Sequence, residues 1–122
     1  MKLVLASQSP RRAEILRNAG IGFEVRVSGI PEQPDNGETP IDYVLRLASS
    51  KARAVSRKQG ETVLGADTVV VLDEHLLEKP ADAADAARML RMLSGREHTV
   101  VTGVCLISDS GDTGAYAETK VT

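Results

Sequence analysis

The segment Ser7-Gln8-Ser9-Pro10-Arg11-Arg12 brings hydroxyl groups and two adjacent guanidinium groups to the predicted start of a helix. Serine followed by proline is typical of a helix start, because serine caps free N–H groups and proline fits the first turn. The helix dipole disfavours cations there by about 0.3–1 kcal/mol each, so Arg11 and Arg12 make physical sense in front of an anion. Free helix N–H groups and bidentate arginines both suit phosphate. A solvated helix start with incidental arginines is the alternative interpretation.

Asp67 lies in a nearly continuous apolar segment, residues 63–72. Aspartate is depleted in strands, and burying a carboxylate is costly unless it has a partner. We therefore expect a metal ion, a water molecule to activate, or a cationic side chain beside Asp67. Gly65 in the same segment would let a ligand or another backbone approach closely. An aspartate that caps a loop at a strand end is the alternative.

Lys51, Lys79 and Glu32 are weaker candidates when each is taken alone. Lys51 falls beside the apolar stripe of a predicted helix, and Lys79 precedes another helix. Lysine stems often lie along apolar surface with the charge in water, so neither residue requires a function. Glu32 belongs to an acidic loop, where a second metal carboxylate and a solvated side chain both fit. His75 and His98 have no partner at the spacing of a zinc site, and no glycine-rich phosphate loop occurs.

Hydrophobic periodicity predicts the elements that must position these residues. Strands are expected at residues 2–6, 23–27, 63–72, 99–107 and 116–121, with a short hairpin arm at Leu76 and Leu77. Helices are expected to begin at Pro10, to span residues 40–58 and to span residues 82–93, the last with Ala83, Ala86, Ala87, Leu90 and Leu93 facing inward. The order β-α-β-α-β-β-α-β-β predicts an α/β protein with a mixed β-sheet flanked by helices.

Composition limits the function classes. The 122 residues are 42% hydrophobic and 26% charged, which is typical of one folded, soluble domain. Two tyrosines, one phenylalanine and a net charge of −2 argue against a nucleic-acid partner. No apolar run is long enough for a membrane span or a signal peptide, so a cytoplasmic location without a membrane partner is expected. Cys105, the single cysteine, is expected to be buried. The oligomeric state, a homodimer included, stays open.

Several short motifs occur in a characteristic order along almost the whole chain. They are Leu5-Ala6-Ser7-Gln8-Ser9-Pro10-Arg11-Arg12, Leu47-Ala48, Lys51-Ala52, Gly65-Ala66-Asp67-Thr68-Val69-Val70, Glu78-Lys79-Pro80, Leu93-Ser94-Gly95, Thr102-Gly103-Val104 and Glu118-Thr119-Lys120-Val121-Thr122. Together they resemble the Maf family of nucleotide pyrophosphatases. The resemblance implies a single Maf/ITPase-like domain over residues 1–122. Because family members continue further, it also implies truncation at the C-terminus, with the second lobe of the cleft and a base-selecting glutamine missing.

The resemblance implies hydrolysis of a nucleoside triphosphate to the monophosphate and pyrophosphate, with Mg²⁺ or Mn²⁺ as cofactor. The motifs Pro10-Arg11-Arg12 and Ala66-Asp67-Thr68 look like the branch that prefers dTTP and UTP. Residue roles carried over from the family are Asp67 as general base and metal ligand, Glu32 as a second metal carboxylate, Arg12 and Thr68 in choosing the base, and Ser7, Arg11, Lys51 and Lys79 in contacting phosphate.

Two other functions stay open from the sequence. One is a non-catalytic nucleotide-binding regulator linked to cell division, which would bind nucleotide without turnover. The other is a pyrophosphatase of the 7-methyl-GTP or purine type. Binding and hydrolysis measured on one panel of nucleotides distinguish both of them from the dTTP/UTP pyrophosphatase.

Overall fold

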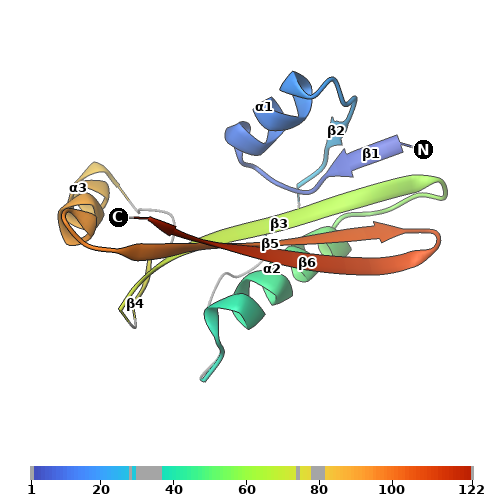
Figure 1. Cartoon of the computed structure of the whole chain (residues 1–122). Coiled ribbons are helices and arrows are strands. Elements are labelled where there is room, and N and C mark those ends of the chain that lie inside the picture. The colour runs from blue at the N-terminus through green and yellow to red at the C-terminus, as the bar shows by residue number, and fades with distance from the viewer. Residues whose placement is uncertain (1, 28, 30–36, 74, 78–81, 122) are drawn as a thin grey trace.

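The structure is a computed structural model that describes residues 2–27, 29, 37–73, 75–77 and 82–121 (Figure 1). Its elements are β1 (Lys2–Leu5), α1 (Pro10–Asn18), β2 (Glu24–Val25), α2 (Pro40–Ala54), β3 (Glu61–Leu72), β4 (His75–Leu77), α3 (Ala83–Leu93), β5 (His98–Ser108) and β6 (Gly111–Val121). This is the element order that the sequence predicts. No helix within the described ranges is long and apolar enough to cross a membrane.

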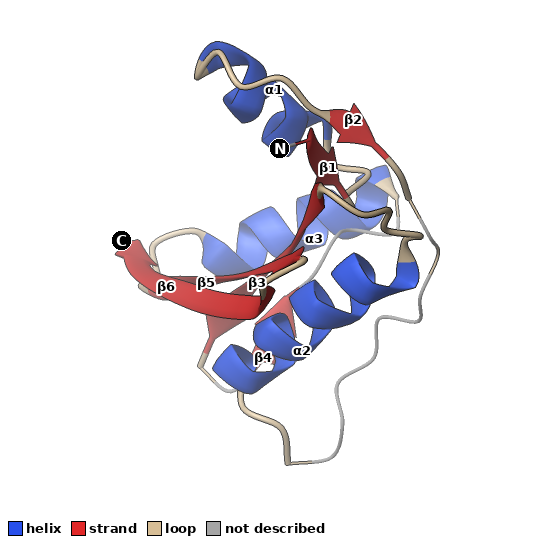
Figure 2. Ribbon diagram, turned by 90° about the vertical axis from the view of Figure 1, so that its right-hand side faces the viewer, coloured by secondary structure: helices blue, strands red, loops and turns tan. Residues whose placement is uncertain are grey.

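The strands form one mixed sheet in the order β2-β1-β3-β5-β6, with β4 paired to β3 outside this path. β1 runs parallel to β2 and β3, whereas β5 is antiparallel to β3 and to β6. Helix α2 packs on one side of the sheet against β3 and β5, and α1 lies on the other side (Figure 2). The predicted mixed sheet with flanking helices is therefore confirmed.

Two glycines let α2 lie directly on the sheet. A Cβ atom on Gly65 of β3 would stand 2.1 Å from the carbonyl oxygen of Ala48, and one on Gly103 of β5 would stand 2.8 Å from that of Val44. Apolar side chains fill the interface on both sides of these contacts, including Tyr43, Val44 and Leu47 of α2, Val63 and Val69 of β3, and Val101 of β5. Cys105 is 5% exposed and belongs to this core, as predicted.

Some predicted boundaries are wrong. Helix α2 ends at Ala54 rather than Lys58, because Val55 takes an extended conformation and packs in the core with Val63. The hairpin of β5 and β6 is longer than predicted and turns at Asp109 and Ser110. Helix α3 begins at Ala83, one residue after the predicted start, with Asp82 as its N-cap, and none of its residues is buried.

The predicted inward face of α3 is wrong in particular at Leu90. This side chain is 69% exposed, and α3 projects from one end of the sheet rather than lying on it (Figure 1). The helical periodicity of apolar residues therefore located the helix correctly but not the surface that it faces.

Glu61 anchors the end of the sheet where β1 and β3 begin. Its carboxylate accepts hydrogen bonds from both terminal nitrogens of Arg26, at 2.6 and 2.7 Å, and from the backbone N–H of Lys58 at 2.8 Å. These hydrogen bonds lower the pKa of Glu61 from 4.5 to about 2, and those from the Arg26 guanidinium have the largest effect. The side chain is only 6% exposed, so this ion pair ties the segment after β2 to the central strand.

The lowered pKa of Glu61 predicts a loss of stability in acid. A carboxyl group with a lower pKa in the folded state stabilises that state above its unfolded value of 4.5 and loses this contribution as the pH falls towards 2. We expect Glu61→Gln to lower the urea midpoint at pH 6, and the difference from the wild type to shrink steadily below pH 4.5. Glu14→Gln on α1, which alters an exposed carboxylate, serves as control. A constant difference across this range would contradict the assignment.

Candidate functional site

The loop after β1 fixes the start of α1. Ser9 caps the helix, as predicted, and accepts a hydrogen bond from the backbone N–H of Arg12. The Ser7 hydroxyl accepts from the backbone N–H of Ser9 and from Nη1 of Arg12, both at 3.2 Å. Ser7 is 7% exposed, so the serine that was predicted to contact phosphate also holds the arginine in place.

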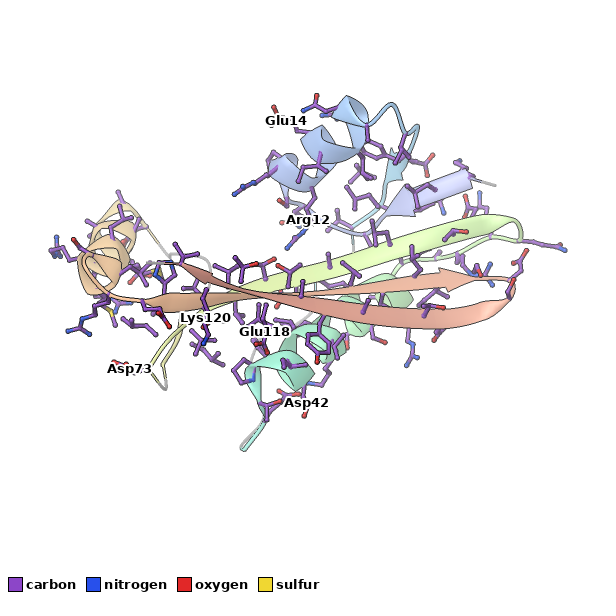
Figure 3. All side chains as sticks on the ribbon, in the orientation of Figure 1. Arg12, Glu14, Asp42, Asp73, Glu118 and Lys120 are labelled. Carbon is purple, nitrogen blue, oxygen red and sulfur yellow. The ribbon has the colours of Figure 1, made fainter. Side chains whose placement is uncertain are left out.

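Arg12 reaches from α1 to the central strand. Its Nη2 donates to the Thr68 hydroxyl at 3.0 Å, and Figure 3 shows its side chain pointing from α1 towards β3. Thr68 also shares a hydrogen bond of 3.0 Å with the hydroxyl of Thr102 on β5. The two residues predicted to choose the base are thus brought together.

Thr102 is part of this cluster, although the sequence analysis gave it no role beyond its place in a motif. It lies directly opposite Thr68 in the register of β3 and β5. This register depends on pairing between residues 34 positions apart, which local periodicity does not determine. The signals in the sequence were its place in the Thr102-Gly103-Val104 motif and its hydroxyl side chain within a mostly apolar strand.

Asp67 has the cationic partner that its burial requires. Nζ of Lys51, in the last turn of α2, donates to Oδ1 of Asp67 at 3.0 Å, and Asp67 is 7% exposed. Among the partners expected from the sequence, the structure therefore provides the cationic side chain. It also shows that Lys51 directs its charge towards the sheet instead of along the surface.

Asp67 and Thr68 lie on opposite faces of β3, because successive side chains of a strand alternate. Val63 and Val69, at odd positions like Asp67, pack against α2. Thr68 and its partner Arg12 lie on the face that carries α1. The predicted site residues therefore form two groups, Lys51 with Asp67 and Ser7 with Arg12 and Thr68.

Both groups lie beside a stretch of β3 in which one edge of the strand is unpaired. One edge of β3 is paired with β5 from Val63 to Val71. The other edge is paired with β1 only as far as Leu64 and with β4 only from Val70 onwards. We call residues 65–69 on this side the edge interval, since no described strand pairs with them there. Within this interval the Thr68 side chain is exposed, whereas Asp67 is only 7% exposed and is bonded to Lys51.

Three predicted site residues remain, and the structure describes one of them, Arg11. Arg11 is exposed at the start of α1, beside Arg12, and makes no hydrogen bond to any residue in the described ranges. Glu32 and Lys79 lie outside the described residues. Strand β4 ends at Leu77, opposite Val70, so Lys79 follows two residues after the strand that borders the edge interval.

The chemistry of Asp67 fits a metal ion that arrives with a polyphosphate. Among the residues that the structure describes, no group of three or more His, Cys, Asp or Glu side chains could hold a metal. Mg²⁺ commonly binds through one or two carboxylates together with substrate phosphates, so a complete protein cage is unnecessary. Asp67, already held by Lys51 through Oδ1, is the described carboxylate that suits this arrangement.

Comparisons with known proteins give a matching family and similar sequences. The family described as Maf-like protein matches residues 2–122. The chain is 54% identical to a dTTP/UTP pyrophosphatase of Koribacter versatilis and 51% identical to one of Geobacter metallireducens, over 100% and 91% of its own length. It spans 64% and 58% of those two proteins.

Solved structures support the fold at lower sequence identity. The Ham1 protein of Staphylococcus aureus matches 98% of the chain with a TM-score of 0.61 and 14% identity, and the chain covers 70% of that structure. A nucleoside-triphosphatase, dITP/XTP pyrophosphatase, of Mycobacterium abscessus matches 98% of the chain with a TM-score of 0.51 and 20% identity, and 72% of that structure is covered. Because the family model matches nearly its whole length, the chain belongs to the Maf family.

Proposed function

We propose that this protein hydrolyses dTTP and UTP to the monophosphate and pyrophosphate. The observation that carries the proposal is the bond from Arg12 to Thr68, directly beside the Lys51–Asp67 pair. Adjacent residues of β3 thus carry, on its two faces, the cations, carboxylate and hydroxyl that we propose act on a pyrimidine triphosphate. Relatives about half identical to the chain carry the name dTTP/UTP pyrophosphatase, which supports the same reaction. We expect the protein to act on the nucleotide pool of the cytoplasm.

Phosphate charge is the first requirement of this reaction. Cleaving a phosphoanhydride depends mainly on positioning and on neutralising charge around the phosphates. Arg11 and Arg12 at the start of α1, together with its N–H groups, provide cationic donors on one face of β3. Lys51 provides a cation on the other face. A triphosphate that passes the edge interval therefore meets positive charge on both faces.

Activation of water is the second requirement. Asp67 is a carboxylate with a fixed orientation, since Lys51 holds Oδ1, and it can accept a proton from an attacking water molecule. A divalent metal bound by Asp67 and the phosphates would supply Lewis-acid stabilisation of the developing charge. The protein's own contribution is to hold the carboxylate, the cations and the phosphate chain in one geometry.

Choice of the base falls to Arg12 and Thr68. The Arg12 guanidinium is fixed at two points, by Ser7 and by Thr68, so its donors have a defined direction. A pyrimidine ring presents carbonyl oxygens that such donors can recognise. A site built to hydrogen-bond particular substrate groups rejects analogues that lack them, because its buried polar atoms are then left unpaired.

The experiment measures pyrophosphate and monophosphate from a panel of nucleoside triphosphates with Mg²⁺. We expect dTTP and UTP to give the highest kcat/KM for the wild type. We expect Thr68→Val, which keeps the shape and removes the hydroxyl that accepts from Arg12, to reduce the preference over purine triphosphates at least about 10-fold. Preference for 7-methyl-GTP or inosine triphosphate would replace this proposal by the purine-type activity. Nucleotide binding without turnover would favour the non-catalytic regulator.

A further inference from the structure

The Thr102 hydroxyl is bonded to Thr68, the residue that also accepts a hydrogen bond from Arg12. The distance from Nη2 of Arg12 to the Thr68 hydroxyl oxygen is 3.0 Å, and the distance between the two threonine hydroxyl oxygens is also 3.0 Å. Thr68 is exposed, whereas Thr102 is half-buried. An influence of Thr102 on a ligand therefore passes through the hydroxyl of Thr68.

The pairing of the sheet holds the two threonine side chains close together. The carbonyl oxygen of Leu64 accepts a hydrogen bond from Ala6, so the even-numbered residues of β3 direct their backbone groups to the β1 side and away from β5. Thr68 and Thr102 are directly opposite each other in the register of β3 and β5. They therefore form a non-hydrogen-bonded pair, the kind in which the two Cα atoms are only about 4.5 Å apart and the side chains lie closest.

The donors and acceptors of this cluster leave two possible arrangements of its protons. Arginine can only donate, so the Thr68 oxygen must accept from Arg12. A hydroxyl group has one proton and two lone pairs. The bond between Thr68 and Thr102 therefore uses either the proton of Thr68 or its second lone pair. In the first arrangement Thr68 offers a lone pair to a ligand, and in the second it offers its proton.

The pairing edge of uracil and thymine distinguishes these two arrangements. This edge carries the acceptor O2, the donor N3–H and the acceptor O4 in that order. Arg12 is a donor and suits a carbonyl oxygen, so the neighbouring Thr68 must accept from N3–H. Thr68 is free to accept a ligand proton when its own proton is held by Thr102.

This inference rests on the proposed hydrolysis of dTTP and UTP. We propose that Thr102 is a positioning residue for base choice, which accepts the proton of Thr68 and so makes Thr68 an acceptor for N3–H of the pyrimidine. Cytosine reverses both groups, with an amino group in place of O4 and a bare nitrogen in place of N3–H. It would set its amino group against Arg12 and its N3 lone pair against a lone pair of Thr68. The Thr102 bond thereby directs the site towards uracil and thymine and against cytosine.

A threonine pair across two strands also has a purely structural role, because such pairs stabilise a sheet. That role predicts that loss of the Thr102 hydroxyl weakens the binding of every nucleotide alike. The positioning role predicts a gain for one nucleotide. Without Thr102 as its acceptor, the Thr68 hydroxyl can turn its proton towards N3 of cytosine.

The test measures the dissociation constants of UTP and CTP for the 122-residue chain by isothermal titration calorimetry without metal. We expect the wild type to bind UTP more tightly than CTP. Thr102→Val, which keeps the shape of the side chain, should bind CTP about 10-fold more tightly than the wild type does, the effect of one hydrogen bond. Its affinity for UTP should stay within about 3-fold. Thr102→Ser keeps the hydroxyl and should retain the preference of the wild type.

Thr99→Val is the matched control. Thr99 is a half-buried threonine of the same strand, and its side chain lies on the other face of the sheet because it is three residues from Thr102. We expect this variant to bind UTP and CTP as the wild type does, with a urea midpoint close to that of Thr102→Val.

The outcomes separate this inference from the proposed function. A wild type that binds neither UTP nor dTTP, or that prefers purine triphosphates, would overturn both. A wild type that prefers UTP to CTP, with the same preference in Thr102→Val, would overturn the role of Thr102 alone. Equal weakening of UTP and CTP in Thr102→Val, or the same change in Thr102→Ser as in Thr102→Val, would also overturn it and leave Thr102 a structural residue.

Discussion

Gly65→Ala is expected to lower the free energy of unfolding by about 3 kcal/mol, because no space exists for a methyl group between β3 and α2. The added Cβ would lie 2.1 Å from the carbonyl oxygen of Ala48 and 2.9 Å from the backbone nitrogen of Ala52. Both atoms belong to the backbone of a helix that is itself packed on β5, so a side-chain movement cannot relieve the overlap. Urea unfolding followed by circular dichroism gives the change directly.

Gly114→Ala is the matched control for this substitution. It is also a glycine in a strand of the same sheet, but its Cβ would meet nothing closer than 3.6 Å, at the carbonyl oxygen of Val104. We expect its stability to stay within about 1 kcal/mol of the wild type, with any change in the direction of a gain, since alanine is less flexible than glycine. Equal losses in the two variants would show that close packing of α2 is not the cause. The same measurement would then assign the loss to the strand itself.

Features set by neighbouring residues were predictable from the sequence. Ser9 with Pro10 and Thr39 with Pro40 both begin helices in the structure, and both caps accept the hydrogen bond that their residue type predicts. The element order follows from periodicity for the same reason. Local chemistry was also enough to mark Asp67 as a residue that required a partner.

Features set by contacts between distant segments were not predictable in this way. Burial of Asp67 left a metal, a water molecule and a cation as partners, and only the packing of α2 on β3 identifies Lys51. The role of Thr102 depends on the register of β3 with β5. The end of α2 at Ala54 depends on the burial of Val55 next to Val63. In each case tertiary packing decides, and helix or strand propensity does not.

The edge interval is the feature of the site that is hardest to predict from the sequence pattern. A strand that reads as continuous apolar sequence suggests complete pairing on both edges, yet β3 is paired with β1 at its start and with β4 at its end on the same side. The site therefore combines residues from two faces of one strand. In the proposed function, these adjacent residues serve different parts of the nucleotide, Asp67 acting at the phosphates and Thr68 at the base.

Asp67→Asn is expected to reduce the rate of pyrophosphate release from UTP by about 10²- to 10⁴-fold, the range for loss of a general base. The amide keeps the shape of the side chain and can still accept from Lys51, but it cannot take a proton from water. The affinity for UTP in the absence of metal should stay the same or increase, because a negative charge near a polyanion is removed. If Asp67 is the general base, Asp67→Asn should therefore still bind UTP but no longer hydrolyse it.

Asp42→Asn provides the control for this change. It makes the same substitution at an exposed aspartate in the first turn of α2, where the cap bond uses the backbone N–H of Asp42 and not its carboxylate. We expect this variant to keep the wild-type rate. Equal rates for Asp67→Asn and the wild type would remove Asp67 from the reaction, whereas loss of UTP binding in Asp67→Asn would assign it a structural role with Lys51. Retained binding in a variant that no longer turns over would place the chemistry at the edge interval of β3.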